Sequence, residues 1–527
     1  MHRKTWILLL ILMCALCLRI YGLGTESLWA DEGISVRTVS VSFTEMKHLL
    51  SRAIHPPLHY LILHGWTHLF GNSEFSVRFP SVIFSLISIF MAYQVGCLLF
   101  DRTTGIFAAL LVSLSLFNIR YAQEARNYSL LCMLGLTSYF YFIKMLQNQD
   151  KKHSIGYLIA SILLLYTHVY GLFTIISHNL YILVRKFVLR REDHPLSLTR
   201  WIGVQVILIL SFSPWFHVIL HHVLNRQAKG SWQPAPSTHN LIGLFVAYAG
   251  SPAMLMLYGV IASIALVLWR RAQGHAPKHH VSKIIALQDL SFTRLEPMYL
   301  LLIWLFSHNV VPFLMSQILT SFYRPRYTIV GSIAFYLLVA KGLRDLSQHK
   351  RLLHAAVASL LILSVVSFRP YYHSYNKERW RDVVAYVDQS AQPGDLVVVN
   401  AGFLLKTNFN YYSKRQDLIK LEFPDTTQHI RKIQPEHLEE LSAYVNHHPR
   451  VWMVFSHSKS SKDVIRKTID LTHKLVEHKQ YHFVSYIRQR KHLGVEVLFF
   501  ERQGQDISQK MAGQDQQARP TARKPSL

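Results

Sequence analysis

Apolar runs close to the length of a membrane span recur through the first 370 residues, and this repetition limits the fold more than any other feature. A helix needs about 20 consecutive apolar residues to cross a bilayer. Charged residues make up 16% of the chain, against about 25% in ordinary soluble domains. The sequence therefore predicts a mainly α-helical, multi-spanning membrane protein.

We expect about eleven spans in this helix bundle. Their approximate limits are residues 5–22, 80–100, 105–122, 128–146, 155–169, 171–189, 201–221, 240–269, 298–319, 324–341 and 352–369. The first apolar run is followed by no A-x-A-like cleavage site, so we expect it to remain as an uncleaved helix. Cys14 and Cys17 lie within it, and we expect them to pack in the core rather than to bind a metal.

The formal net charge of +26 would suggest a nucleic-acid partner in a soluble protein. Here Lys and Arg gather in the linkers between apolar runs, which indicates membrane topology instead. With the N-terminus in the cytoplasm, the basic linkers fall on the cytoplasmic side. They are Asp101-Arg102, Gln147–His153, Arg185–Arg200, Trp269–Arg294 and Lys341–Arg351.

This orientation places the first long loop, residues 23–79, outside the cell or in the periplasm of a bacterium. Within it, Leu58–Phe70 is too short to span a bilayer and is predicted to lie in the membrane interface. A second interfacial helix is expected over Phe43–Arg52. Residues 1–369 thus form the predicted membrane domain.

The composition changes near Pro370, and residues 370–502 are predicted to form a small α/β domain on the outer side. Its expected elements are a helix at Trp380–Ser390, a buried strand at Leu396–Val399, a strand at Val451–Phe455, a helix at Lys462–His478 and a strand at Val495–Phe500. Residues 503–527 are polar, without an apolar pattern, and are predicted to be a disordered tail.

Two adjacent carboxylates, Asp31 and Glu32, follow the first span. They have two explanations. They can perform chemistry at the outer face, or they can stabilise the N-terminus of a short helix, Gly33–Val39, through its dipole.

Other polar groups interrupt the outer ends of later spans. They are His55, Arg78, Glu124, Arg126, Tyr128, His168, Arg324, Arg326 and Tyr327. Each kind of residue also has a purely structural explanation. The prolines after His55 can begin a helix, arginines can snorkel to the lipid headgroups, and tyrosines can anchor the membrane interface. Taken together, they place carboxylates, histidines and arginines at one membrane boundary. Chemistry on a lipid phosphate needs such a set: a base for the nucleophile, and cations for the departing phosphate.

Four motifs follow one another along the chain. They are Leu28-Trp29-Ala30-Asp31-Glu32, His55-Pro56-Pro57-Leu58-His59-Tyr60, Phe75–Ser81 and Tyr121–Tyr128. Their spacing resembles that of bacterial GT-C glycosyltransferases similar to protein O-mannosyltransferases and lipid A aminoarabinose transferases. Tyr323–Tyr327 resembles a late motif of the same group.

The resemblance implies an integral membrane enzyme that uses a polyprenyl-phosphate sugar as donor. It implies that Asp31 is the general base and that Glu32 orients it or binds sugar. It makes Glu124 a candidate for binding sugar or acceptor, and leads us to expect no obligatory metal, although the acidic residues could hold Mg²⁺ or Mn²⁺. The remaining candidates, for the donor and its phosphate, are His55, Arg78, Arg126, Tyr128, His168, Arg324, Arg326 and Tyr327.

Two other classes of function stay open. A transporter or flippase of lipid-linked sugars would also carry charged residues within the membrane, although no inverted repeat is visible in this sequence. A non-catalytic scaffold would leave the polar clusters unexplained. The sequence does not identify the sugar or its acceptor.

Overall fold

The computed structural model describes residues 2–51, 55–148, 150–188, 196–229, 235–274, 283–319, 321–400, 403–424, 433–456, 462–485 and 490–503. The chain divides into two compact units. The membrane unit is Met1–Thr25 with Thr38–His373, and the C-terminal unit is Glu26–Arg37 with Ser374–Leu527. Nearly all of the predicted disordered tail lies outside the described residues.

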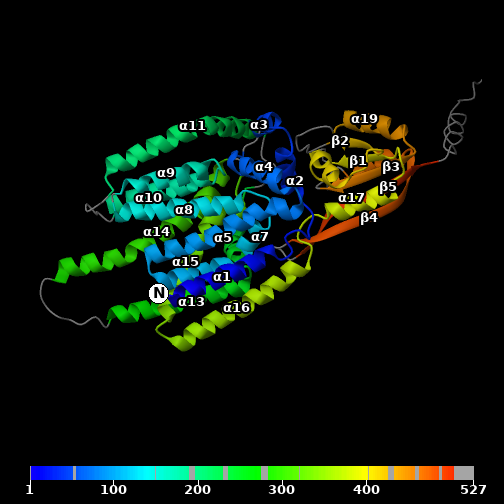
Figure 1. Cartoon of the computed structure of the whole chain (residues 1–527). Helices are drawn as coiled ribbons and strands as arrows, with labels where there is room; N and C mark the ends of the chain where they lie inside the picture. Colours follow the sequence, from blue (N-terminus) through cyan, green and yellow to red (C-terminus); the bar gives the residue numbers. More distant parts are fainter. Residues whose placement is uncertain are drawn as a thin grey trace, which may run out of the picture. The chain divides into compact units, whose positions relative to one another are not determined.

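The membrane unit consists of helices, coloured from blue to yellow-green in Figure 1. They are α1 (His2–Ile20), α3 (Phe43–Ser51), α4 (Leu58–Phe70), α5 (Glu74–Leu99), α6 (Arg102–Leu114), α7 (Leu116–Ala122), α8 (Tyr128–Gln147), α9 (Lys151–Leu165), α10 (Gly171–Leu183), the π-helix η1 (Val184–Val188), α11 (Leu198–Lys229), α12 (Thr238–Ala249), α13 (Pro252–Gly274), α14 (Lys283–Ile318), the 3₁₀-helix η2 (Pro325–Thr328), α15 (Ile329–Leu346) and α16 (Lys350–His373). Helix α2 (Ala30–Val39) begins in the C-terminal unit and ends in the membrane unit.

Each predicted span overlaps one or two of the described helices. Within the described residues, five helices are long and apolar enough to cross a membrane, or seven if each of two bent pairs is one span. The chain is therefore a multi-pass membrane protein, while the predicted count of about eleven spans stays a prediction. Helices α3 and α4 occupy the two segments predicted to lie in the membrane interface, and their placement in the interface stays a prediction.

Linkers that were predicted to share one side of the membrane lie together. The Arg344 Nε atom, at the end of α15, is 2.5 Å from Asp101 Oδ2, just before α6. Near the N-terminus, Lys4 Nζ donates to Thr103 Oγ1 over 3.0 Å. These contacts support the predicted alternation of the helices, and the direction in which each end faces remains a prediction.

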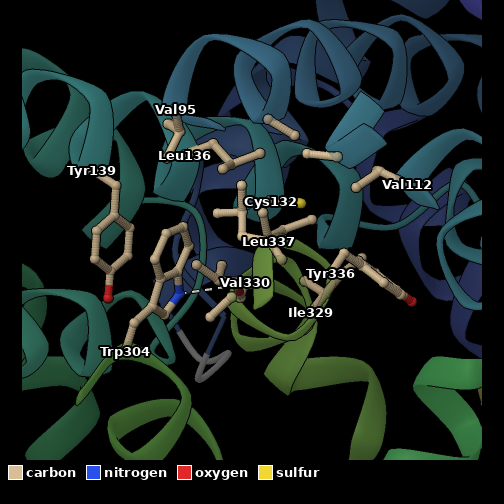
Figure 2. Packing of buried hydrophobic residues seen from close by; sticks show 14 of the residues in the cluster. Val95, Val112, Cys132, Leu136, Tyr139, Trp304, Ile329, Val330, Tyr336 and Leu337 are labelled. Carbon is tan, nitrogen blue, oxygen red and sulfur yellow. Dashed lines mark hydrogen bonds between the residues drawn. The ribbon is translucent and has the colours of Figure 1, made fainter. Parts of the chain in front are cut away.

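The core of the membrane unit is packed where α8, α14 and α15 meet (Figure 2). The Tyr139 ring stacks on Trp304, with 3.5 Å between ring centroids, and the Trp304 indole donates to the Val330 carbonyl over 3.1 Å. A Cβ on Gly135 would lie 2.8 Å from a Val330 methyl group, so α8 needs glycine there to approach α15 this closely.

The expectation that Cys14 and Cys17 pack in the core is wrong. Both side chains are exposed on α1. The buried stripe of this helix runs through Leu8, Ile11 and Ala15, and its spacing of three and four residues turns the cysteines to the opposite face.

The C-terminal unit contains one five-stranded sheet, in the order β2-β1-β3-β5-β4. Its elements are α17 (Trp380–Ser390), β1 (Leu396–Asn400), the π-helix η3 (Leu405–Phe409), α18 (Asn410–Tyr412), β2 (Ile419–Phe423), α19 (Pro435–Asn446), β3 (Arg450–Ser456), α20 (Lys462–Asp470), β4 (His473–Ser485) and β5 (Arg490–Arg502). Strand β1 pairs in parallel with β2 and β3, whereas β5 runs antiparallel to β3 and β4.

Alternate residues of the central strands pack into two different hydrophobic cores, one on each face of the sheet. Val397 and Val399 face a core that includes Trp380 of α17, whereas Leu396 and Val398 face a core with residues of α19 and α20. All five residues of β1 are buried, as expected for a strand covered on both faces.

The predicted helix Lys462–His478 is wrong in its second half. Helix α20 ends at Asp470, and edge strand β4 begins at His473. The polar sequence of β4 carries little strand signal of its own, because the strand is defined by its pairing with β5.

Candidate active site

Three polar turns of the membrane unit converge on one group of side chains. We call Arg126, Tyr128, His168, Arg326 and Tyr327 the Arg–Tyr–His cluster. Its members come from the turn between α7 and α8 with the first residue of α8, from the turn between α9 and α10, and from η2. The ring centroids of His168 and Tyr327 are 4.8 Å apart, and those of Tyr128 and Tyr327 are 6.1 Å apart. Residues separated by up to about two hundred positions thus meet at the ends of predicted spans.

Hydrogen bonds tie these turns to one another. The Asn127 side-chain amide donates to the Thr167 carbonyl over 3.0 Å, joining the first turn to the second. The Leu58 backbone N–H donates to the Tyr166 carbonyl over 3.0 Å, which fixes the start of α4 against the second turn. Ser81 Oγ donates to the Glu124 carbonyl over 2.7 Å, holding the first turn on α5.

The arginines of the cluster lie close to tyrosine rings. The Arg326 guanidinium carbon is 5.7 Å from the Tyr128 ring centroid and 5.4 Å from that of Tyr327. Arg126 lies 5.9 Å from the same Tyr128 ring. Tyr128 is fully buried and Arg126 is only 5% exposed. Two guanidinium groups beside one ring concentrate positive charge there, which is suited to an anion.

His168 presents a hydrogen-bond donor to this cluster. Its Nδ1 atom accepts from the Tyr170 backbone N–H over 3.0 Å, so in the neutral ring the proton resides on Nε2. Burial, with the nearby positive charges of His55, Arg126 and Arg326, holds the pKa of His168 well below its usual value. The buried Nε2 atom has no hydrogen-bond partner among the described residues. The Nε2–H group of His168 is therefore a neutral hydrogen-bond donor without an acceptor among the described residues.

Two further histidines lie beside the cluster. His55, a predicted site residue, is 5.8 Å from His168 between ring centroids. His59, on α4, is 4% exposed, and burial with the charge of Arg126 lowers its pKa from 6.5 to about 3. His59 was not among the predicted site residues, although its spacing from His55 across two prolines was a usable signal.

Glu124 lies in the same turn as Arg126 and is 1% exposed. Its Oε1 atom is 3.4 Å from Arg120 Nε, and its buried Oε2 atom has no hydrogen-bond partner among the described residues. A buried carboxylate oxygen with spare capacity is suited to a sugar hydroxyl.

Two predicted phosphate ligands lie outside the cluster as defined. Arg78, on α5, is 1% exposed, and its Nη1 atom donates to the Leu23 carbonyl over 2.8 Å, which ties the end of the first span to α5. Arg324 precedes η2 and is half-buried. Tyr170, which the sequence analysis did not select, has its ring centroid 5.2 Å from that of Tyr327.

The acidic pair belongs to the C-terminal unit, not to the membrane domain in which the sequence analysis placed it. Asp31 and Glu32 occupy the first turn of α2, as the dipole explanation also expects. Glu32 is fully buried and its carboxylate oxygens are 3.2 and 3.3 Å from Lys377 Nζ. Glu32 Oε2 also accepts from the Trp29 backbone N–H over 3.4 Å, as an acidic residue at this helical position does. Asp31 is half-buried.

Within the described part of the chain, no group of three or more His, Cys, Asp or Glu side chains is placed to hold a metal ion.

Comparisons with known proteins agree with the fold. Residues 54–217 match the family model of dolichyl-phosphate-mannose-protein mannosyltransferases. No curated protein matches the sequence significantly. ArnT from Cupriavidus metallidurans, in the apo state, aligns with TM-score 0.58 and 14% identity over 94% of this chain and 98% of that chain.

The same ArnT bound to undecaprenyl phosphate aligns with TM-score 0.57 and 15% identity, again over 94% and 98%. The oligosaccharyltransferase AglB from Archaeoglobus fulgidus, in complex with an inhibitory peptide and a dolichol-phosphate, aligns with TM-score 0.51 and 10% identity, over 94% of this chain and 74% of that chain. These findings confirm the predicted resemblance at the level of the fold: the chain has the fold of ArnT and AglB, and residues 54–217 match the mannosyltransferase family model.

Proposed function

We propose that this chain is a membrane glycosyltransferase that moves a sugar from a polyprenyl-phosphate donor to an acceptor hydroxyl. Two proteins that share its fold, ArnT and AglB, have been solved with undecaprenyl phosphate and with a dolichol-phosphate. We further propose that the reaction takes place on the outer face of the plasma membrane, the inner membrane of a bacterium. The C-terminal unit would lie on that side and the N-terminus in the cytoplasm.

The Arg–Tyr–His cluster is the observation that carries this proposal. Arg126 and Arg326 supply two guanidinium groups, and His168 adds a neutral N–H donor. When the bond from the anomeric carbon to phosphate breaks, its electron pair goes to a phosphate oxygen. Fixed cations and donors stabilise that charge without reorganising during the reaction. We assign the phosphate of the donor to this cluster, with His55, Arg324 and Tyr327 around it and Arg78 in support.

Asp31 is proposed as the general base. It removes the proton of the acceptor hydroxyl, and the resulting oxygen attacks the anomeric carbon opposite the phosphate, so that the configuration inverts. Glu32 supports Asp31 through the ion pair with Lys377. Glu124 binds sugar or acceptor through its spare carboxylate oxygen. We propose that no metal is obligatory, because the cations of the cluster already stabilise the leaving group.

A flippase of lipid-linked sugars is the alternative function. It would need cations for the phosphate, and it would give no role to a half-buried carboxylate at the start of a helix.

The experiment is a transfer assay with purified protein in proteoliposomes. Donors are polyprenyl-phosphate mannose and polyprenyl-phosphate aminoarabinose, acceptors are a Ser/Thr peptide and lipid A, and the readout is release of free polyprenyl phosphate, which is common to every acceptor. We expect release that depends on an acceptor and persists in EDTA. Transbilayer movement of donor without any release would contradict the proposal and favour the flippase.

A further inference from the structure

The segment that carries Asp31 is bound to the C-terminal unit at almost every position. Ser27 Oγ accepts from the Arg381 backbone N–H over 3.1 Å. The Leu28 backbone N–H donates to Tyr412 Oη over 2.8 Å. Ala30 is buried in the core that contains Trp380. Contacts this dense fix the backbone on the N-terminal side of Asp31.

Asn408 holds the same segment at two points. Its Nδ2 atom donates to the Leu28 carbonyl over 3.0 Å, and its Oδ1 atom accepts from Thr407 Oγ1 over 2.8 Å. A Cβ added to Gly33 would lie 2.8 Å from Asn408 Cγ, closer than real Cβ atoms come to a neighbour. Asn408 is fully buried and sits on the π-helix η3, a conformation often found at functional sites. One amide therefore contacts the chain before Asp31, at Leu28, and after it, at Gly33.

Lys377 fixes the segment from another direction. Its side chain is 8% exposed and that of Glu32 is 0% exposed, so the two charges are a buried ion pair. Such a pair holds a single geometry, because separating its members would leave a charge buried without compensation.

We propose that the C-terminal unit is a positioning element for catalysis: Asn408 and Lys377 hold residues 28–33 so that the Asp31 carboxylate has one fixed placement. This inference rests on the proposed role of Asp31 as base. It gives the C-terminal unit a function, and it assigns positioning roles to two residues that lie more than 340 positions away in the sequence. A base displaced by about 1 Å loses about a hundredfold in rate, so the anchor has a measurable consequence.

The test compares Asn408→Ala with Lys406→Ala in the full-length protein. Lys406 is on the same π-helix, but its side chain is 59% exposed and pairs with Glu422. We expect Asn408→Ala to lower kcat by about tenfold to a hundredfold with the KM for donor unchanged, and Lys406→Ala to leave both unchanged.

A second arm tests the packing itself. Gly33→Ala alone should lower kcat as Asn408→Ala does, because the new methyl group displaces the amide. In the double variant Gly33→Ala/Asn408→Ala the methyl group has room, so kcat should fall no further than in Asn408→Ala. Hydrogen exchange of the amides of residues 29–36 should be faster in Asn408→Ala and in Gly33→Ala than in the wild type.

Outcomes of the two arms are separable. An active wild-type enzyme whose Asn408→Ala variant keeps full kcat would overturn the positioning inference and leave the proposed function standing. If the losses of kcat in Gly33→Ala and Asn408→Ala were fully additive in the double variant, the positioning inference would also be overturned. A wild-type protein that releases no polyprenyl phosphate would overturn the proposed function, and with it any catalytic meaning of the anchor.

Discussion

The region of the Arg–Tyr–His cluster and the segment around Asp31 differ in the hydrogen bonding of their buried polar groups. In the cluster region, the buried atoms His168 Nε2, His59 Nε2 and Glu124 Oε2 have no hydrogen-bond partner among the described residues. In the segment, the buried Glu32 is paired with Lys377, and the Leu28 backbone is bonded through both its N–H and its carbonyl.

A buried polar atom without a partner costs about 1–3 kcal/mol, so such atoms need a reason. Several together beside two arginines indicate a place prepared for a polar, anionic ligand. Glu32 and the Leu28 backbone are instead bonded to other residues of their own unit, and these bonds hold the segment in place. The difference fits the roles proposed for the two regions, and each of the following variants tests one side of it.

The largest effect is expected from breaking the Glu32–Lys377 pair. Glu32→Gln leaves a buried lysine charge without its partner, and the free energy of unfolding of the C-terminal unit should fall by about 3–5 kcal/mol. The double variant Glu32→Gln/Lys377→Met should recover most of that loss. Urea-induced unfolding followed by tryptophan fluorescence measures both. A double variant as unstable as the single variant would show that the pair is not what holds Glu32.

Removing a guanidinium group should come next. Arg326→Ala should slow release of polyprenyl phosphate by about 10²–10³-fold, the usual cost of losing one stabilising group for developing negative charge. Arg326→Lys should be intermediate, because an ammonium group cannot bind phosphate bidentately. Arg344→Ala, which breaks the ion pair with Asp101 at the other end of α15, is the control. If Arg344→Ala slowed the release of polyprenyl phosphate as much as Arg326→Ala does, the proposed role of Arg326 in binding phosphate would be contradicted.

His168 tests whether the unused donor is functional. His168→Phe should lower the rate by about 10–100-fold, since a hydrogen bond to a charged group contributes about 1.5–3 kcal/mol. His168→Gln, whose amide can still donate, should retain more activity. Because burial holds the pKa of His168 well below its usual value, the ratio of the wild-type rate to the His168→Gln rate should not change as the pH passes through 6.5. A ratio that changes with a midpoint near 6.5 would contradict the neutral donor.

His59 gives the smallest effect, in the pH dependence of stability. The folded protein keeps His59 neutral down to about pH 3, whereas the unfolded chain protonates it near pH 6.5. Between these values the unfolded state binds more protons, so stability falls as the pH falls, by about 1.4 kcal/mol per unit. Above pH 6.5 this contribution is absent. Unfolding of wild type and His59→Gln at pH 5 and 7.5 measures the difference. An equal pH dependence in both proteins would contradict the buried neutral state.

Local patterns predicted local structure well. The bounds of α4 and α17 match those expected from the sequence, because apolar spacing and flanking prolines or turns mark both ends. The turns bearing Arg126, His168 and Arg326 were expected at one boundary, since basic residues there run against the topology of the other linkers.

Partners distant in the sequence were not predictable. Nothing near Asp31 indicates Lys377 or Asn408, and periodicity identifies a buried face without identifying what covers it. For the same reason residues 26–37 were predicted to belong to the membrane domain, whereas they belong to the C-terminal unit. Edge strand β4 was missed because its pairing partner, not its composition, defines it.

Transfer by the Asp31→Asn variant is the most direct test of the whole account. The substitution keeps the size of the side chain and removes its basicity, so release of polyprenyl phosphate should fall by about 10²–10⁴-fold while donor binding is kept. Asp417→Asn, at an exposed ion pair of the same unit, should behave as wild type. If Asp31→Asn transferred sugar at the wild-type rate, Asp31 would only stabilise the start of α2, and the general-base mechanism would be wrong.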